Sequence, residues 1–223
     1  MKHILLILSL ILLSYKIQAQ NSSDNKVGTW YMFNGSHKIS EKFTIKSAIH
    51  FRYFEFITDY QQEIYRLGLN YKINPNTNFT LGSVYSITDN SYQQDLPDLY
   101  EYRFYQDLNI KDQWGNFGVK HRVRLAQRFK RQNFVNKTTH RIRYGLFMNH
   151  PLSKKLTTYI FNEIFIKFAK KTFGQNRTGF GFLQKLNNQM KLKIGYMYTQ
   201  FSNSKSHRLQ LGIILNTNHI RNI

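Results

Sequence analysis

Arginines recur at alternate positions along successive segments of this chain, and glutamates join them on the same polar faces. The guanidinium group binds carboxylates and phosphates through paired hydrogen bonds. Opposite charges that meet across two strands stabilise a sheet by about 0.2–1 kcal/mol per pair. We therefore predict a charge network that lines the lumen of a barrel, made of Arg52, Arg66, Glu101, Arg103, Arg122, Arg124, Arg128, Arg141, Arg143, Glu163 and Arg177.

Two interpretations of this network stay open. Folding residues 99–125 about 112–113 sets Glu101 opposite Arg124 and Arg103 opposite Arg122, and folding 141–166 about 153 sets Arg143 opposite Glu163. Such pairs predict a structural ladder that fills a narrow barrel. Arginines nevertheless outnumber carboxylates, and a net positive, hydrated lumen attracts small anions. Alternatively, the acidic residues Asp95 and Asp98 fold inward as a plug.

Other chemistry is sparse. The chain has no cysteine, which excludes disulfides, thiolate metal sites and a cysteine nucleophile. Its histidines show no metal-ligand spacing, so we predict no metal, no cofactor and no assigned catalytic residue. An outer-membrane lipase or acyltransferase needs a serine, a histidine and an acid near the outer rim. The only candidates there are polar loop residues, namely His140, His207, Ser202, Ser204 and Ser206.

The segments that carry these residues are predicted to be β-strands. Apolar and polar residues alternate with a period of two, which is typical of strands with two different faces. The segments are 43–53, 64–71, 79–87, 100–108, 117–125, 141–148, 158–168, 177–184, 191–199 and 208–215, with a weaker one from Val27 to Asn34 around Trp30. Short turns alternate with mostly longer connections at 56–62, 88–98, 130–139, 169–176 and 202–207. This organisation is typical of an outer-membrane barrel.

The polar face is predicted to face inward. Mid-strand glycines such as Gly68, Gly82 and Gly195 share the arginine face, and small residues belong on the crowded concave side of a closed sheet. Aromatic residues lie toward strand ends on the apolar face, as membrane interfaces require. A sheet open to lipid would leave backbone groups unpaired. We therefore predict an all-β, antiparallel transmembrane β-barrel of about 10–12 strands.

The first residues specify export. A short basic start is followed by an apolar run from Ile4 to Leu13 and a small residue at Ala19. This predicts a signal peptide over 1–19 and one barrel domain over 20–223, located in the outer membrane of a Gram-negative bacterium. The formal charge of +20 raises nucleic acid as a partner, but export and the lack of a basic helical face argue against it. Expected partners are outer-membrane lipid, lipopolysaccharide phosphates, small anions and the barrel-assembly machinery.

The order of the lumen motifs resembles a family of uncharacterised outer-membrane barrel proteins, a domain of unknown function. The residues that carry the resemblance are Trp30, Glu101-Tyr102-Arg103, Arg122 through Arg128, Arg141-Ile142-Arg143, Asn162-Glu163, Asn176-Arg177 and Gly195-Tyr196. The family usually has glutamate at the position of Ala126, so one lumen pair of the family is missing here. The resemblance implies an outer-membrane barrel and no known activity.

The function that we predict is a small non-enzymatic outer-membrane barrel, either a narrow anion-tolerant, porin-like pore or a closed structural barrel with an arginine-rich lumen. An alternative is an outer-membrane enzyme that acts on lipid or lipopolysaccharide. A third is a soluble periplasmic barrel that binds an apolar ligand.

Overall fold

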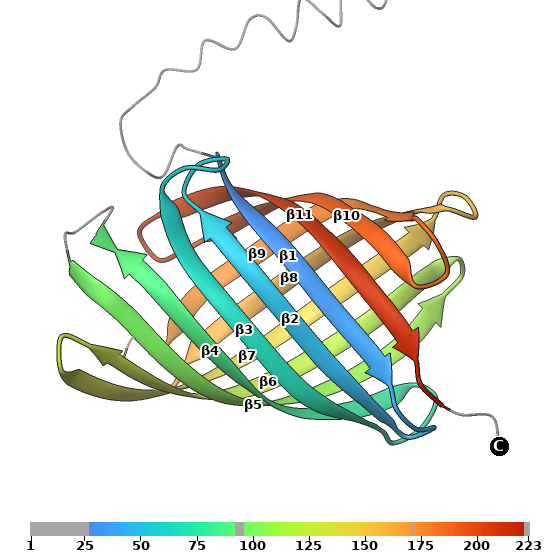
Figure 1. The fold of residues 1–223 in the computed structure, drawn as a ribbon, viewed down its shortest axis with the longest axis horizontal. Coiled ribbons are helices and arrows are strands. Elements are labelled where there is room, and N and C mark those ends of the chain that lie inside the picture. Colours follow the sequence, from blue (N-terminus) through green and yellow to red (C-terminus); the bar gives the residue numbers. More distant parts are fainter. Residues whose placement is uncertain (1–26, 92–95, 171, 221–223) are drawn as a thin grey trace, which may run out of the picture.

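A computed structural model of the chain describes residues 27–91, 96–170 and 172–220. These residues form eleven strands that close into one barrel (Figure 1). The predicted signal peptide lies outside the described residues. Within them, no helix is long and apolar enough to cross a membrane. The strands are β1 (Val27–Lys38), β2 (Phe43–Tyr53), β3 (Tyr60–Lys72), β4 (Thr77–Asn90), β5 (Leu96–Trp114), β6 (Phe117–Gln132), β7 (Val135–Pro151), β8 (Leu156–Lys167), β9 (Phe173–Lys185), β10 (Met190–Gln200) and β11 (Lys205–Asn218).

The barrel closes through a parallel pair. Each strand is antiparallel to the next, but β1 pairs with β11 in parallel, from Val27 opposite His207 to Lys38 opposite Asn218. With an odd number of strands that alternate in direction, the first and the last must point the same way. Figure 1 shows β1 and β11 side by side, with both arrows toward the lower right. The all-β barrel and its predicted strand number are confirmed, while the fully antiparallel arrangement is wrong at this one seam.

The two faces of the sheet differ in polarity, and the apolar face lies outside. On β3, Leu67 and Leu69 are exposed, whereas Asn70 between Leu69 and Tyr71 is buried inside the barrel. The same alternation places large apolar side chains around the outer surface, among them Leu81, Phe104, Phe180 and Ile194. A water-soluble barrel has the opposite arrangement, with its apolar face in the core. The outer surface is therefore of the kind that a lipid-facing barrel presents.

The two rims have connections of similar length. The rim formed by 39–42, 73–76, 115–116, 152–155 and 186–189, here called the turn rim, has tight turns as predicted. The opposite rim, here called the loop rim, has shorter connections than the sequence predicts. Residues 130–139 were expected to be a loop, but β6 and β7 run through them to a two-residue turn at Asn133 and Phe134, both with positive φ. Positive φ at both central residues is the signature of a type I′ hairpin turn.

The register of two hairpins differs from the prediction. The β5–β6 turn lies at Gly115-Asn116, where Gly115 has a φ of 57°. Glu101 therefore lies opposite Lys130 instead of Arg124, and Arg103 opposite Arg128 instead of Arg122. In the β7–β8 hairpin, Glu163 lies opposite Gly145 instead of Arg143. In the β5–β6 hairpin the cause is that β5 continues past its predicted end, because glycine reaches positive φ without steric cost and takes the turn.

Candidate functional site: the charged interior of the barrel

Strand alternation directs the predicted charge network to the inside of the barrel. The eleven predicted residues come from β2, β3, β5, β6, β7, β8 and β9, and all have the inward parity of their strands. Side chains two residues apart share one face of a strand. Arg122, Arg124 and Arg128 of β6 consequently lie in one row along the inner wall.

The first ionic cluster surrounds Glu101 near the loop rim. Arg128 donates from Nε to Oε1 at 2.7 Å and from Nη2 to Oε2 at 2.6 Å. Arg103, two residues along β5, also donates from Nε and Nη2 to Oε1, at 2.8 and 2.6 Å. Glu101 is buried, and its two oxygens are satisfied by two guanidinium groups. The predicted partner Arg124 is not involved.

The second cluster lies deeper, at Asp107. Arg124 forms a two-pronged ion pair with this buried carboxylate, and its Cζ lies 4.2 Å from the ring centroid of Tyr105. The Tyr105 ring packs with Ile64, Val84 and Ala126. Tyr105 lies directly opposite Ala126, the position for which the resemblance implies a glutamate, and the two side chains belong to the same apolar cluster.

The third cluster is centred on Glu163 of β8. Arg122 forms an ion pair with Oε1 of Glu163, and the Nε of Arg143 lies 3.7 Å from the same atom. Arg143 thus reaches Glu163 diagonally across the β7–β8 pair, although the two residues are not in register. The Glu163 carboxylate is therefore shared by Arg122 and Arg143. The Cζ of Arg143 also lies 4.9 Å from the ring centroid of Phe165.

Four of the predicted arginines form no ion pair among the described residues: Arg52, Arg66, Arg141 and Arg177. Three of them lie over aromatic rings instead. The Cζ of Arg52 lies 3.6 Å from the ring centroid of Trp30, Arg177 lies 4.9 Å from the same ring, and Arg141 lies 4.9 Å from Phe165. Cation–π contacts stabilise a guanidinium without cancelling its charge. The interior therefore keeps an excess of positive charge.

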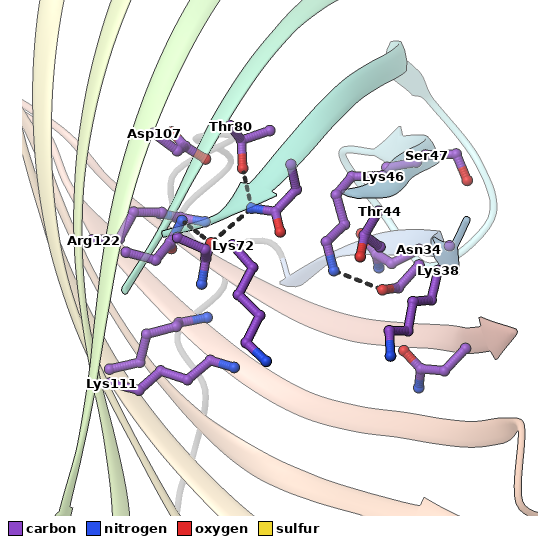
Figure 2. A pocket seen from close by; sticks show the side chains of 18 of the residues that line it. Asn34, Lys38, Thr44, Lys46, Ser47, Lys72, Thr80, Asp107, Lys111 and Arg122 are labelled. Atoms are coloured by element: carbon purple, nitrogen blue, oxygen red, sulfur yellow. Dashed lines mark hydrogen bonds between the residues drawn. The ribbon is translucent and has the colours of Figure 1, made fainter. Parts of the chain in front are cut away.

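Two cavities lie inside the barrel, one toward each rim. The cavity near the turn rim has a volume of about 620 Å³, and Figure 2 shows its lining. The cavity near the loop rim measures about 400 Å³, and Trp30, Arg52 and Arg177 contribute to its wall. The two share no lining residue. Between them, Met197 and Phe161 pack with Trp30 in a small apolar cluster.

The turn-rim cavity contains basic residues that the sequence interpretation missed. The predicted network contains only arginines and glutamates, but Lys46, Lys111 and Lys120 also have the inward parity of β2, β5 and β6 and line this cavity, together with Lys72. The signal was present in the sequence. Lys46 shares parity with Arg52, and Lys120 shares parity with Arg122.

The residues considered for lipid hydrolysis lie at or near the loop rim. His207 contacts the hydroxyl of Tyr196 through Nδ1, and His140 is exposed. Neither ring is hydrogen-bonded to a serine or a carboxylate side chain among the described residues. Asp98, proposed as part of a plug, lies in β5 and lines a groove on the outer side of the barrel, and Asp95 lies outside the described residues. In the parts of the chain that the structure describes, no three histidine or acidic side chains cluster as a metal site would require.

Comparisons with known proteins relate the chain to a protein family and to a porin structure. A family model described as a protein of unknown function (DUF2490) matches residues 27–210. The barrel is similar to a crystal structure of a NanC porin, with a TM-score of 0.55 and 12% sequence identity over 85% of this chain and 98% of that one. At this identity the similarity concerns the fold alone. No curated protein matches the sequence.

Proposed function

We propose that this chain, which belongs to the DUF2490 family of proteins of unknown function, is a small non-enzymatic barrel of the outer membrane whose basic interior forms a narrow anion-tolerant pore. The observation that carries the proposal is the excess of interior cations over carboxylates. Glu101, Asp107 and Glu163 are each already held by arginine. Charge on the remaining guanidinium and ammonium groups favours anions in the lumen and repels cations.

The outer surface supports a location in the membrane. Apolar side chains cover it, and aromatic pairs lie toward the ends of the strands, such as Tyr85 with Tyr102 at 4.9 Å between ring centroids and Phe43 with Tyr71 at 5.2 Å. Aromatic rings at both ends of an apolar band are typical of barrels that span a bilayer. The fold shared with a protein called a porin is consistent with passage of solutes.

The packed middle of the barrel makes the pore narrow. Tyr105 and Met197 are almost fully buried there, and the Asp107–Arg124 pair lies beside Tyr105. Ions that cross must pass the side chains that separate the two cavities. We therefore expect small single-channel currents with a preference for chloride over potassium.

The test is a planar-bilayer recording of the refolded chain, with the reversal potential measured under a potassium chloride gradient. The wild type should be anion-selective, and Arg66→Gln should shift the reversal potential toward zero because Arg66 contributes an unpaired charge to the turn-rim cavity. The matched control, Lys154→Gln, removes the same charge from the exposed 152–155 turn and should change little. A cation-selective current would refute the proposal, and a silent but inserted barrel would make it a closed structural barrel.

Phosphates of lipopolysaccharide are the lipid partner that we propose. A groove of about 840 Å³ on the outer side near the loop rim is lined by Tyr100, Tyr102 and Phe129 and by the basic residues Arg131 and Lys137. Aromatic rings suit the interface between acyl chains and headgroups, and basic side chains attract phosphate. Binding of lipid A to the wild type and to Arg131→Gln, compared by native mass spectrometry, tests this contact. Equal binding to both would argue against it.

A further inference from the structure

The turn-rim cavity concentrates basic side chains on one part of the barrel wall. Lys46, Lys72, Lys111 and Lys120 come from β2, β3, β5 and β6, and Arg66 of β3 joins them. Figure 2 shows the labelled side chains of Lys46, Lys72 and Lys111 extending into the cavity. Strand register explains part of this gathering, because Lys111 lies directly opposite Lys120 on the inner face of the β5–β6 hairpin. Like charges directly opposite one another destabilise a sheet.

Neither carboxylate of the cavity is available to neutralise these lysines. Glu41 accepts two hydrogen bonds from Lys38, both at 3.0 Å, and Asp107 is held by Arg124. Among the described residues, Lys46, Lys72, Lys111 and Lys120 form no ion pair. Lys46 donates to the Ser36 hydroxyl at 2.6 Å. The cavity thus contains four lysines without an ion-pair partner in the described part of the chain, of which Lys46 and Lys120 are half-buried and Lys72 and Lys111 are exposed at its mouth.

The neutral side chains of the cavity also present donors. Asn70 donates to Oδ1 of Asn78 at 2.7 Å and to the Thr80 hydroxyl at 2.8 Å. Asn109 donates to the same Oδ1 of Asn78 at 3.2 Å. The Asn78 oxygen therefore has two donors already, whereas its own NH₂ group makes no hydrogen bond to the described residues. A ligand that brings negatively charged acceptor oxygens suits the Asn78 amide and the ammonium groups, whereas a neutral sugar would leave the ammonium charges uncompensated.

We propose that the turn-rim cavity is a binding site for a soluble multivalent oxyanion, an oligophosphate or a polycarboxylate, chelated by Lys46, Lys72, Lys111 and Lys120. A single phosphate would leave most of the 620 Å³ empty, while cavities of this size hold ligands of many atoms. Several charges on one ligand satisfy ammonium groups from four strands at once. The inference deepens the proposed pore by naming a site and a ligand class.

The experiment is calorimetric titration of the refolded full chain in a zwitterionic detergent with tripolyphosphate, citrate, orthophosphate and maltose. We expect one site per chain, with tripolyphosphate and citrate binding at least about tenfold more tightly than orthophosphate and maltose silent. The double variant Lys72→Gln/Lys111→Gln should weaken tripolyphosphate binding by about tenfold or more. The matched control, Lys154→Gln/Lys155→Gln, removes two charges from the exposed turn of the same rim and should bind as the wild type does.

A second measurement needs no variant. Tripolyphosphate should protect Lys72 and Lys111 of the wild type, but not Lys154, from acetylation, as read by mass spectrometry of the peptides. Absence of binding, equal loss in both double variants or uniform protection would overturn the site. These binding measurements are independent of the planar-bilayer recording. If the barrel conducts no current in that recording but binds tripolyphosphate, only the pore is refuted. A conducting barrel that does not bind it refutes the site alone.

Discussion

Arg52 of β2 stacks on Trp30 of β1, with its Cζ 3.6 Å from the ring centroid. Arg177 of β9 lies 4.9 Å from the same ring, so one indole contacts a guanidinium group from the neighbouring strand β2 and another from β9, which is not adjacent to β1. Arg52 also donates to Oε1 of Gln62 at 2.7 Å. Trp30 is buried and therefore organises the wall of the loop-rim cavity without removing its charge.

Trp30→Ala is expected to destabilise the barrel by about 3–5 kcal/mol, because a large buried ring is lost and two guanidinium groups lose their aromatic contact. Equilibrium unfolding in guanidinium chloride, with the chain in detergent micelles, measures the change. Trp114→Ala is the control. Trp114 is half-exposed at the turn rim and donates to Asp112 at 2.8 Å, so its loss should cost about 1 kcal/mol or less. Equal losses would contradict the role given to Trp30.

Asp107→Asn should destabilise the barrel by about 3–5 kcal/mol, because it leaves the buried Arg124 guanidinium without its carboxylate. Removing both charges, in Asp107→Asn/Arg124→Gln, should cost less than the single change. The exposed Lys38–Glu41 pair supplies the control, since Glu41→Gln should change the unfolding free energy by less than about 1 kcal/mol. A double variant less stable than Asp107→Asn would show that Arg124 is stabilised by other contacts.

Strand alternation was enough to predict which face each arginine occupies, but the partners could not be predicted. Glu101 lies opposite Lys130, six residues farther along β6 than the predicted Arg124, and Glu163 lies opposite Gly145, two residues from the predicted Arg143. Both shifts are even, and an even shift leaves every side chain on its own face. A prediction from periodicity therefore keeps the inner row of arginines while it assigns the wrong pairs.

Lys111, one of the turn-rim lysines, was missed for a related reason. The segment from Asp112 to Asn116 contains several residues that favour turns, and β5 was predicted to end at residue 108. In the structure β5 extends to Trp114, so Asn109 and Lys111 continue the inner row. The choice among several turn-forming residues depends on contacts with neighbouring strands. Such contacts involve residues far apart in the sequence and leave no local pattern.

Gly82→Ala should disturb the middle of the barrel. A Cβ atom at Gly82 would lie 2.5 Å from the Leu67 carbonyl oxygen and 2.5 Å from Cζ of Tyr105. Because both the backbone and a buried ring would have to move, we expect a loss of about 1–3 kcal/mol in the free energy of unfolding. Gly118→Ala is the control, since the three atoms nearest to the new Cβ all belong to the Asn149 side chain, the first at 2.9 Å. If both variants were equally stable, the close packing of Tyr105 on Gly82 would be wrong.

The parallel seam between β1 and β11 predicts one specific cross-link. Phe33 lies opposite Ile213 on the outward face, and paired positions of neighbouring strands bring Cα atoms within the range that a disulfide spans. The chain has no native cysteine, so Phe33→Cys/Ile213→Cys should form an intramolecular disulfide on mild oxidation, seen as a mobility shift in unfolded samples on non-reducing gels.

The control for this seam is Phe33→Cys/Leu209→Cys. Leu209 lies opposite Thr29 in the parallel register, and four residues along a strand separate the two cysteines by about 13 Å, beyond the reach of a disulfide. This pair should stay reduced under the same conditions. Cross-linking of the control pair in place of the first would mean that β1 and β11 close the barrel in another register, because a parallel pair fixes the partner of every residue along both strands.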